Sequence, residues 1–261
     1  MLNCILSKVF EVCINSQLMS HMESHGLYSR SQHAYRHHRS VSSALQDLNT
    51  IQADLRNRGK VVCLLTTDVS AGFNLVSKNI LIPKLRLLGL DSSASDLLFN
   101  YLTGRKTKTV IENSVSEEIT LETGVGEGSV LGPNCFSINM VCISEVAKRT
   151  ERRMKEEHGK TIEAYTDEFA DDATGILGAD CEADLQLAIN IMLEEFLEYY
   201  SVSVSFMPRL TSKLHSRLLL LRQSSESFSR PSTFQNVHFL TAETLLREFS
   251  CCWFLMNCNI V

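Results

Sequence analysis

The sequence predicts an α+β fold, in which helices alternate with short strands that pair as antiparallel hairpins. Apolar residues recur at helical spacing over residues 2–25 and again over 183–200. Residues 61–65 form a short apolar run typical of a buried strand, and residues 162–177 contain two strand-like runs around an acidic turn. Hydrophobic residues make up 44% of the 261-residue chain, enough for a core that needs neither disulfides nor metals.

The N-terminal part is predicted to hold two helices joined by a basic loop. The first helix covers residues 2–25, and residues 28–40 are polar and loop-like. A second helix begins at Ser42, where the hydroxyl of Ser42 or Ser43 could cap it, and it ends at Gly59.

The rest of the pattern alternates helices with short strands up to about residue 200. In chain order we expect helices over 77–88 and 96–102, strands over 107–111 and 119–121, a helix over 135–146, two strands within 162–177 and a helix over 183–200. Residues 149–160 are densely charged and should be exposed. After about residue 210 serines abound and no motif is recognisable.

Charge and cysteine usage limit the class of protein. A formal net charge of −5 weighs against nucleic-acid binding, which favours basic domains. The nine cysteines include no Cys-x-x-Cys pair, which argues against a zinc finger and favours reduced, mostly buried thiols. The start of the chain lacks the basic region of a signal peptide, and no apolar run approaches the roughly 20 residues of a membrane span. We expect an intracellular protein of the cytoplasm or nucleus that does not contact membranes.

Local basic clusters run against this acidic total. Residues 28–39 contain three arginines, three histidines and no acidic residue, and Arg105, Lys106 and Lys108 form a second cluster. Local patches rather than net charge contact phosphates. From charge alone, however, a solvated loop surface is the simpler interpretation.

Three aspartates are candidates for metal chemistry. Asp68 follows the strand over 61–65, and Asp171 and Asp172 are adjacent in the turn of the predicted hairpin. Two such charges about 4 Å apart repel by roughly 4 kcal/mol at an effective dielectric of 20, so solvation or cations must offset the repulsion. Paired divalent metals serve in-line displacement at phosphorus, and hard oxygen ligands suit Mg²⁺. The alternative is an exposed turn, where Asp-Asp is common.

A glycine-rich stretch over residues 124–132 is a weaker signal. It lacks the Lys-Ser/Thr of a phosphate-binding P-loop, and it does not fit the dinucleotide-binding pattern of a βαβ unit. Taken alone, it is more simply a turn.

Six motifs in chain order carry a resemblance to a known family. They are S-K-V-F-E at residues 7–11, S-Q-H-A-Y-R-H-H-R-S at 31–40, D-V-S-A-G-F-N at 68–74, Y-L-T-G-R at 101–105, G-V-G-E-G-S-V-L-G-P at 124–133 and F-A-D-D at 169–172. Together they resemble the reverse transcriptase domain of non-LTR (LINE-type), jockey- or CR1-like retrotransposons. The resemblance covers about residues 1–205 and implies a truncated RNA-directed DNA polymerase that transfers dNTPs to a primer 3′-hydroxyl.

The resemblance also implies a role for each candidate residue. Asp68, Asp171 and Asp172 are the implied catalytic residues, which with the Val69 carbonyl would hold two Mg²⁺ ions, for which Mn²⁺ could substitute. The implied nucleotide-binding residues are Lys8, Arg36, Arg39, Phe73, Glu127 and Gly128. The implied contacts to template and primer come from Arg105, Lys106, Phe169 and Ala170. Without the motif, Phe73 would be interpreted as ordinary core packing.

The implied architecture is the fingers and palm of a right-hand polymerase, with an antiparallel palm sheet backed by helices. Residues 1–60 would form part of the fingers, residues 61–205 the palm with a fingers insertion, and residues 206–261 an unrelated or degenerate tail. The family's L-x-x-N-x-x-K-T segment is not recognisable, so we expect the thumb to be missing or incomplete. The implied partners are an RNA template, a DNA primer and dNTPs, and nothing in the sequence indicates an obligate oligomer.

Some positions depart from the family pattern. Gly126 and Glu127 stand where the family has Pro-Gln, which brings a negative charge beside nucleic acid. Asn74 replaces an aspartate and Gly72 an alanine. These changes leave two alternatives to an active polymerase: an inactive retroelement remnant, or a nucleic-acid-binding module that has no polymerase activity.

Overall fold

The computed structural model describes residues 5–69, 72–126, 128–203, 214–221 and 237–241 of the chain. The chain divides into two compact units. The first consists of Met1–Tyr28, Ala71–Val141 and Tyr200–Phe206, and the second of Ser29–Ser70, Cys142–Tyr199 and Met207–Val261.

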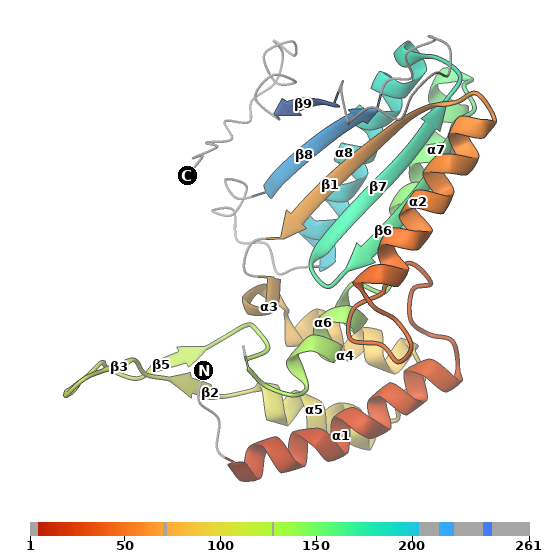
Figure 1. Cartoon of the computed structure of the whole chain (residues 1–261). Coiled ribbons are helices and arrows are strands. Elements are labelled where there is room, and N and C mark those ends of the chain that lie inside the picture. The colour runs from red at the N-terminus through yellow and green to blue at the C-terminus, as the bar shows by residue number, and fades with distance from the viewer. Residues whose placement is uncertain (1–4, 70–71, 127, 204–213, 222–236, 242–261) are drawn as a thin grey trace. The chain divides into compact units, whose positions relative to one another are not determined.

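The first unit is mainly helical (Figure 1). Its helices are α1 (Ile5–Ser24), α3 (Gly72–Leu75), α4 (Lys78–Leu87), α5 (Ser92–Leu102) and α6 (Gly132–Asn139). Between α5 and α6 the chain forms two small antiparallel ribbons, β2 (Arg105–Thr107) with β5 (Ile119–Leu121) and β3 (Val110–Ile111) with β4 (Ser114–Val115). Helix α5 begins where the Asp91 carboxylate accepts a hydrogen bond from the Ala94 amide, a standard N-cap.

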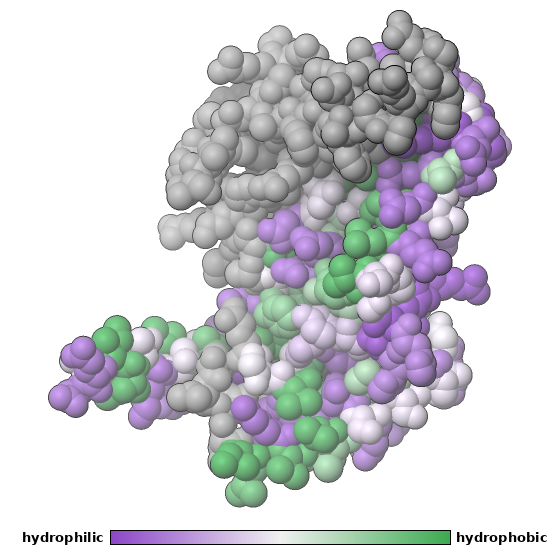
Figure 2. All heavy atoms as spheres, in the orientation of Figure 1, coloured by the Kyte–Doolittle hydropathy of each residue, from purple (hydrophilic) through white to green (hydrophobic). Residues whose placement is uncertain are grey.

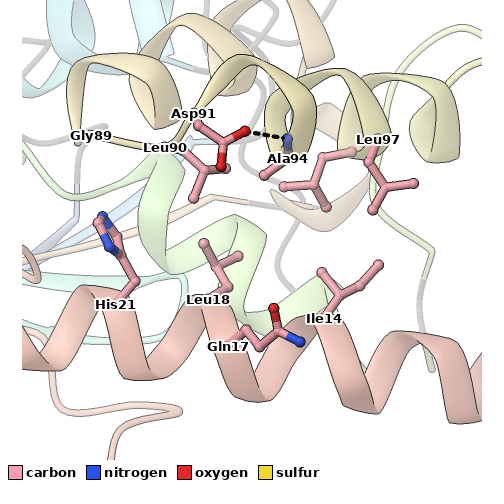
Figure 3. A pocket seen from close by; sticks show the side chains of 10 residues that line it. Ile14, Gln17, Leu18, His21, Gly89, Leu90, Asp91, Ala94 and Leu97 are labelled. Atoms are coloured by element: carbon pink, nitrogen blue, oxygen red, sulfur yellow. Dashed lines mark hydrogen bonds between the residues drawn. The ribbon is translucent and has the colours of Figure 1, made fainter.

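Helix α1 has an exposed apolar start, and a small cavity lies between α1 and α5. Figure 2 shows apolar side chains along the start of α1, where Ile5, Leu6 and Val9 are exposed. A cavity of ≈ 290 Å³ lies between α1 and α5, lined in part by His21 and Asp91 (Figure 3). Both of these side chains already have partners, since His21 Nε2 lies 2.9 Å from the Leu88 carbonyl oxygen and Asp91 caps α5, so the cavity is a gap between packed helices.

The second unit is a five-stranded antiparallel sheet with helices on both faces (Figure 1). The strand order is β6 (Glu163–Phe169), β7 (Asp172–Ala179), β1 (Val61–Val69), β8 (Leu214–Leu221) and β9 (Val237–Thr241). The helices are α2 (Val41–Asn57), α7 (Glu145–His158) and α8 (Glu182–Ser203), the last of which belongs to this unit up to Tyr199.

Strand alternation determines which residues each helix covers. On one face, Leu55 of α2 packs with Val62, Leu64 and Ile176 to form the core beneath that helix. On the other face, a Cβ at Gly175 would lie 2.5 Å from the Met192 sulfur of α8, so a larger residue there would require the Met192 side chain to move. The carboxylates described below lie at one end of strands that are anchored in this way.

The structure corrects the predicted cap of α2. Ser40, not Ser42 or Ser43, is the N-cap: its hydroxyl accepts from the Ser43 amide at 3.3 Å, and the Ser43 hydroxyl accepts from the Ser40 amide at 3.0 Å. The pair is a capping box in which serine replaces the usual glutamate. The preference of serine for the N-cap position does not indicate which of the three serines at 40, 42 and 43 caps the helix.

The prediction of a single helix over residues 135–146 is wrong. Helix α6 ends at Asn139 and α7 begins at Glu145. In between, amides bond three residues back, for example Glu145 to the Cys142 carbonyl oxygen at 3.0 Å. Because apolar residues continue through the break, hydrophobic periodicity could not reveal it.

The prediction that the thiols are mostly buried is also wrong for the cysteines that the structure describes. Cys63 and Cys135 are buried, but Cys13, Cys142 and Cys181 are exposed, and all five are free. Within the same described part of the chain, no helix combines the length and apolar character that crossing a bilayer requires.

Candidate active site

The candidate site lies on the α2-covered face of the sheet, at one end of the pairing between β1 and β7. Residues directly opposite one another in an antiparallel pair point to the same face. From the α2 core outward, the opposed pairs on this face are Val62 with Gly178, Leu64 with Ile176, Thr66 with Thr174 and Asp68 with Asp172. The face therefore changes from apolar to hydroxyl to carboxylate within four layers.

Asp68 and Asp172 are direct cross-strand neighbours. Such neighbours have Cβ atoms roughly 5 Å apart, so two carboxylates that are distant in sequence share one end of the sheet face. Burial raises the pKa of Asp172, and the negative charges of Asp171 and then Asp68 raise it further. Asp172 therefore interacts electrostatically with both of the other carboxylates.

Asp171 reaches this position through a tight hairpin. Phe169 pairs with Asp172, so Ala170 and Asp171 form a two-residue tip between β6 and β7. Ala170 has φ of 60°, in the left-handed region that L-residues other than glycine rarely adopt. This backbone conformation turns the chain sharply enough to leave Asp171 beside the first residue of β7.

A layer of hydroxyls separates the carboxylates from the apolar core. The Oγ1 atoms of Thr66 and Thr174 lie 3.5 Å apart across the two strands. Both threonines are half-buried, while Asp172 is exposed and Asp68 half-buried. The threonine layer therefore keeps the carboxylates at the solvated end of the face, where less desolvation is required to keep them charged.

The donor chemistry fits a hard divalent cation, because carboxylate oxygens suit Mg²⁺ and a cation would relieve the mutual repulsion of Asp68, Asp171 and Asp172. Among the residues that the structure describes, no group of three or more His, Cys, Asp or Glu side chains is arranged so that it could hold a metal ion. The site is thus an open cluster of like charges at a strand end.

A buried polar cluster lies on β6 next to this site. His33 Nε2 lies 3.2 Å from the Asp167 carboxyl group and 3.3 Å from that of Asp47. Burial raises the pKa of Asp167 to about 7, assisted by the charge of Asp47, and burial also lowers the pKa of His33. Burial likewise raises the pKa of Glu168 to about 7. Near neutral pH, Asp167 and Glu168 therefore populate both their charged and their uncharged forms.

The predicted phosphate-binding arginines belong to the same unit as the carboxylates. Arg36 Nη1 donates to the carbonyl oxygens of Ser29 at 2.8 Å and Gln32 at 3.3 Å, which braces the basic loop. Arg39 Nη1 lies 3.8 Å from the Asp47 carboxylate. Both arginines are half-buried.

The other predicted nucleotide and template residues belong to the first unit. Phe73 stacks on the buried Phe136 ring with centroids 5.2 Å apart, so it has a packing partner. Lys8 and Gly128 are exposed, and Glu127 lies outside the described residues. Arg105 Nη1 donates to the Gly124 carbonyl oxygen at 3.2 Å, and Lys106 pairs with Glu118 at 2.8 Å.

The structure thus groups some of the predicted site residues and not others. Asp68, Val69, Asp171 and Asp172 share one unit with Phe169, Ala170, Arg36 and Arg39. Sequence reasoning missed the buried polar residues Gln32, His33, Asp167 and Glu168 as members of this region. The one available signal was the acidic pair Asp167-Glu168 within the predicted hairpin over 162–177, since a charged pair that is buried needs polar partners.

Comparison with known proteins gives one family match and one distant relative. The family described as reverse transcriptase (RNA-dependent DNA polymerase) matches residues 2–206. The retrovirus-related Pol polyprotein from the type-1 retrotransposable element R2 of Popillia japonica is 26% identical over 83 residues. That similarity spans 32% of this chain and 14% of the polyprotein.

Solved telomerases resemble this chain in fold. Apo telomerase from Candida tropicalis, truncated from its C-terminal domain, has a TM-score of 0.53 and 10% identity, covering 92% of this chain and 44% of that one. Telomerase from the same organism in complex with the TWJ fragment of telomeric RNA has a TM-score of 0.50 and 12% identity, covering 77% and 32%. The predicted mixture of helices and antiparallel sheets is confirmed, and the chain spans less than half the length of these relatives.

Proposed function

The chain belongs to the reverse transcriptase (RNA-dependent DNA polymerase) family, and from that premise we propose that it catalyses RNA-directed DNA synthesis as part of a jockey- or CR1-like non-LTR retrotransposon. One observation carries the proposal: Asp68 lies directly opposite Asp172, with Asp171 next to it at the hairpin tip. Family membership supports the reaction class, and this register supports the assignment of the acidic residues.

Asp68 and Asp171 would hold both of two Mg²⁺ ions, the Val69 carbonyl oxygen would bind one of them, and Asp172 would supply a further carboxylate to the metal site. When bound, such a metal pair activates the attacking hydroxyl and stabilises the leaving oxygen in phosphoryl transfer. The protein's own contribution is to fix carboxylates from β1 and β7 in one register. A fixed register orients the ligands in advance, and orientation supplies much of the rate in phosphoryl transfer.

By the resemblance, six residues would hold the nucleotide. Arg36, Arg39 and Lys8 would contact its triphosphate, because guanidinium and ammonium groups donate to phosphate oxygens. Phe73 would exclude a 2′-hydroxyl and so select deoxynucleotides. Glu127 and Gly128 would lie along the nascent base pair, where glycine permits close approach of the backbone.

The RNA template and DNA primer would run along Arg105, Lys106, Phe169 and Ala170. In this assignment residues 1–60 belong to the fingers and residues 61–205 to the palm with a fingers insertion, while residues 206–261 lie outside the polymerase domain. We also assign the protein to the cytoplasm or nucleus, because its template and primer are found there.

Primer extension tests the proposal. The full chain is given an RNA template, an annealed DNA primer, dNTPs and Mg²⁺, beside the Asp171→Asn variant. The matched control is Asp180→Asn, which alters an exposed aspartate just beyond the other end of β7, where it pairs with Lys60 at 2.8 Å. We expect incorporation by the wild type and the control, and a loss of about 100-fold or more in Asp171→Asn, corresponding to several kcal/mol of transition-state stabilisation.

Other outcomes point to the alternatives. Incorporation that is equal in Asp171→Asn would contradict the assignment of the carboxylates. No incorporation, together with RNA binding that weakens steeply with salt, would identify a nucleic-acid-binding module. Neither incorporation nor binding would identify an inactive remnant.

A further inference from the structure

A buried glutamine lies beside the hairpin tip that carries Asp171. Gln32 is 1% exposed and belongs to a short segment that runs parallel to the end of β6. The His33 amide donates to the Glu168 carbonyl oxygen at 2.9 Å, and the Glu168 amide donates to the Ser31 carbonyl oxygen at 2.9 Å. These two backbone bonds fix the position of Gln32 next to the β6–β7 hairpin.

The Gln32 side chain forms hydrogen bonds with both the amide and the carbonyl group of Ala170. Its Oε1 accepts from the Ala170 amide at 3.2 Å and from the Ala34 amide at 2.9 Å. Its Nε2 lies 3.5 Å from the Ala170 carbonyl oxygen and 3.4 Å from Glu168 Oε2. Two donors face one end of the amide and two acceptors face the other, so only one orientation of the amide satisfies all four.

Glu168 is itself held in place. It is 2% exposed, and its Oε1 accepts from the hydroxyls of Ser31 at 2.5 Å and Ser29 at 3.1 Å. Because Oε1 is occupied by two hydroxyls, Oε2 remains directed at the Gln32 amide. The buried chain from Ser29 to Ala170 is therefore continuous, and a partly broken buried network of this kind is costly.

Ala170, which these bonds hold on both sides, has a strained backbone conformation. Ala170 has φ of 60°, a conformation that costs an alanine free energy and persists only where surrounding contacts impose it. It immediately precedes Asp171, so a change of its backbone angles would swing that carboxylate away from Asp68 and Asp172. The pairing of Phe169 with Asp172 closes the turn, and the bonds from Gln32 add side-chain contacts that hold the Ala170 backbone in this conformation.

We propose that Gln32 is a positioning residue: its amide clamps the left-handed turn at Ala170 and so holds Asp171 in register with the other two carboxylates. The inference rests on the proposed function, because it assigns Gln32 a role in preparing the metal site. It makes the S-Q-H-A motif part of the metal site's support, in addition to the phosphate contacts assigned to the arginines that follow.

Gln32→Leu removes the amide while keeping a similar volume, and Gln46→Leu is the matched control. Gln46 is exposed on α2 in the same unit. Gln32→Leu should raise hydrogen exchange at the Ala170 amide about five- to tenfold, the effect of losing one or two net hydrogen bonds. It should weaken Mn²⁺ binding, followed by electron paramagnetic resonance, by a similar factor. The control should change neither quantity.

A rescue separates positioning from a general structural defect. Glycine adopts positive φ freely, so Ala170→Gly added to Gln32→Leu should recover part of the lost Mn²⁺ affinity. In primer extension, Gln32→Leu should raise the Mg²⁺ concentration for half-maximal rate while the KM for template–primer stays constant. If Gln32→Leu does not fold, Gln32→Asn, one methylene too short to reach Ala170, should show the same shifts.

The result that would overturn the inference is unchanged exchange at Ala170 and unchanged Mn²⁺ affinity in Gln32→Leu, or no recovery on adding Ala170→Gly. Failure of the proposed function is recognised separately. In that case the wild type incorporates no dNTP, while the exchange and Mn²⁺ measurements still report on Gln32.

Discussion

The two ends of one sheet face differ in what they contribute. At one end, Leu64 and Ile176 oppose each other beneath α2 and are buried in the core. Two layers further along the same strands, Asp68 and Asp172 oppose each other with the same geometry. The same antiparallel register thus places two buried apolar side chains opposite each other at one end and two carboxylates that repel each other at the other end.

The difference shows how a strand pair can hold carboxylates that would otherwise move apart. Burying a leucine-sized side chain contributes roughly 1.5–3 kcal/mol, so Leu55, Leu64 and Ile176 together outweigh the roughly 4 kcal/mol of repulsion between two carboxylates. Because side-chain direction alternates strictly along a strand, fixing Leu64 also fixes the direction of Asp68. The buried apolar residues therefore fix the position of the strands, and this in turn fixes the positions of Asp68 and Asp172.

The largest expected effect comes from breaking the apolar end. Leu64→Ala should lower the free energy of unfolding by about 2–5 kcal/mol, because it leaves a cavity against Leu55 and Ile176. Urea unfolding measures the change. The Mn²⁺ affinity of the folded variant should stay near that of the wild type, and a large loss of affinity without loss of stability would show that the two ends are not separable.

A second, smaller effect concerns the buried carboxyl group beside the hairpin. Burial raises the pKa of Glu168 to about 7 from its ordinary 4.5. The folded state therefore binds a proton that the unfolded state releases, so stability falls as pH rises from about 4.5 to 7 and then levels off, by at most on the order of 3 kcal/mol.

The Glu168→Gln variant should remove this contribution. Its unfolding free energy, measured by urea titration from pH 4.5 to 8, should decline less steeply with pH than that of the wild type. His33 contributes with the opposite sign, because burial lowers its pKa, and it is unchanged in the variant. Parallel pH profiles for the two proteins would contradict the account of Glu168.

The smallest expected effect is at the acidic end. Burial and the neighbouring charges of Asp171 and Asp68 raise the pKa of Asp172, so its ionised form is disfavoured in the folded state above about pH 4. Asp172→Asn should therefore raise the unfolding free energy slightly at pH 7 without divalent cations, by up to about 1 kcal/mol for this exposed group. The gain should shrink at pH 4, and a clear loss of stability at pH 7 would contradict the repulsion.

The strands that carry the site can be predicted from the sequence more readily than the buried residues that hold the site in place. The apolar run at 61–65 predicts a strand, and the structure extends it to Val69 because Thr66 and Thr67 also favour extended backbone. The hairpin containing Asp171 follows from two strand-like runs around an acidic turn. The opposition of Asp68 and Asp172 depends on pairing between strands about 100 residues apart, and a local pattern does not specify a long-range register.

Gln32 shows why such buried polar residues cannot be predicted from the sequence. A glutamine in a basic, loop-like segment has the composition of an exposed side chain, yet four backbone and side-chain partners bury it. Those partners come from positions as far along the chain as Ala170. Burial of a polar residue depends on such tertiary partners, which neither propensity nor periodicity encodes.

The most direct test of the central claim is a Mn²⁺ titration of the full chain, followed by electron paramagnetic resonance, with Asp68→Asn and Asp172→Asn beside the wild type. If the carboxylates of β1 and β7 form one site, each substitution on either strand should weaken binding of the same ions by about tenfold or more, since a cation that loses a carboxylate ligand loses its main stabilisation. Asp180→Asn should bind as the wild type does. Unchanged Mn²⁺ binding in Asp68→Asn would mean that Asp68 is not part of the metal site, and would contradict the account.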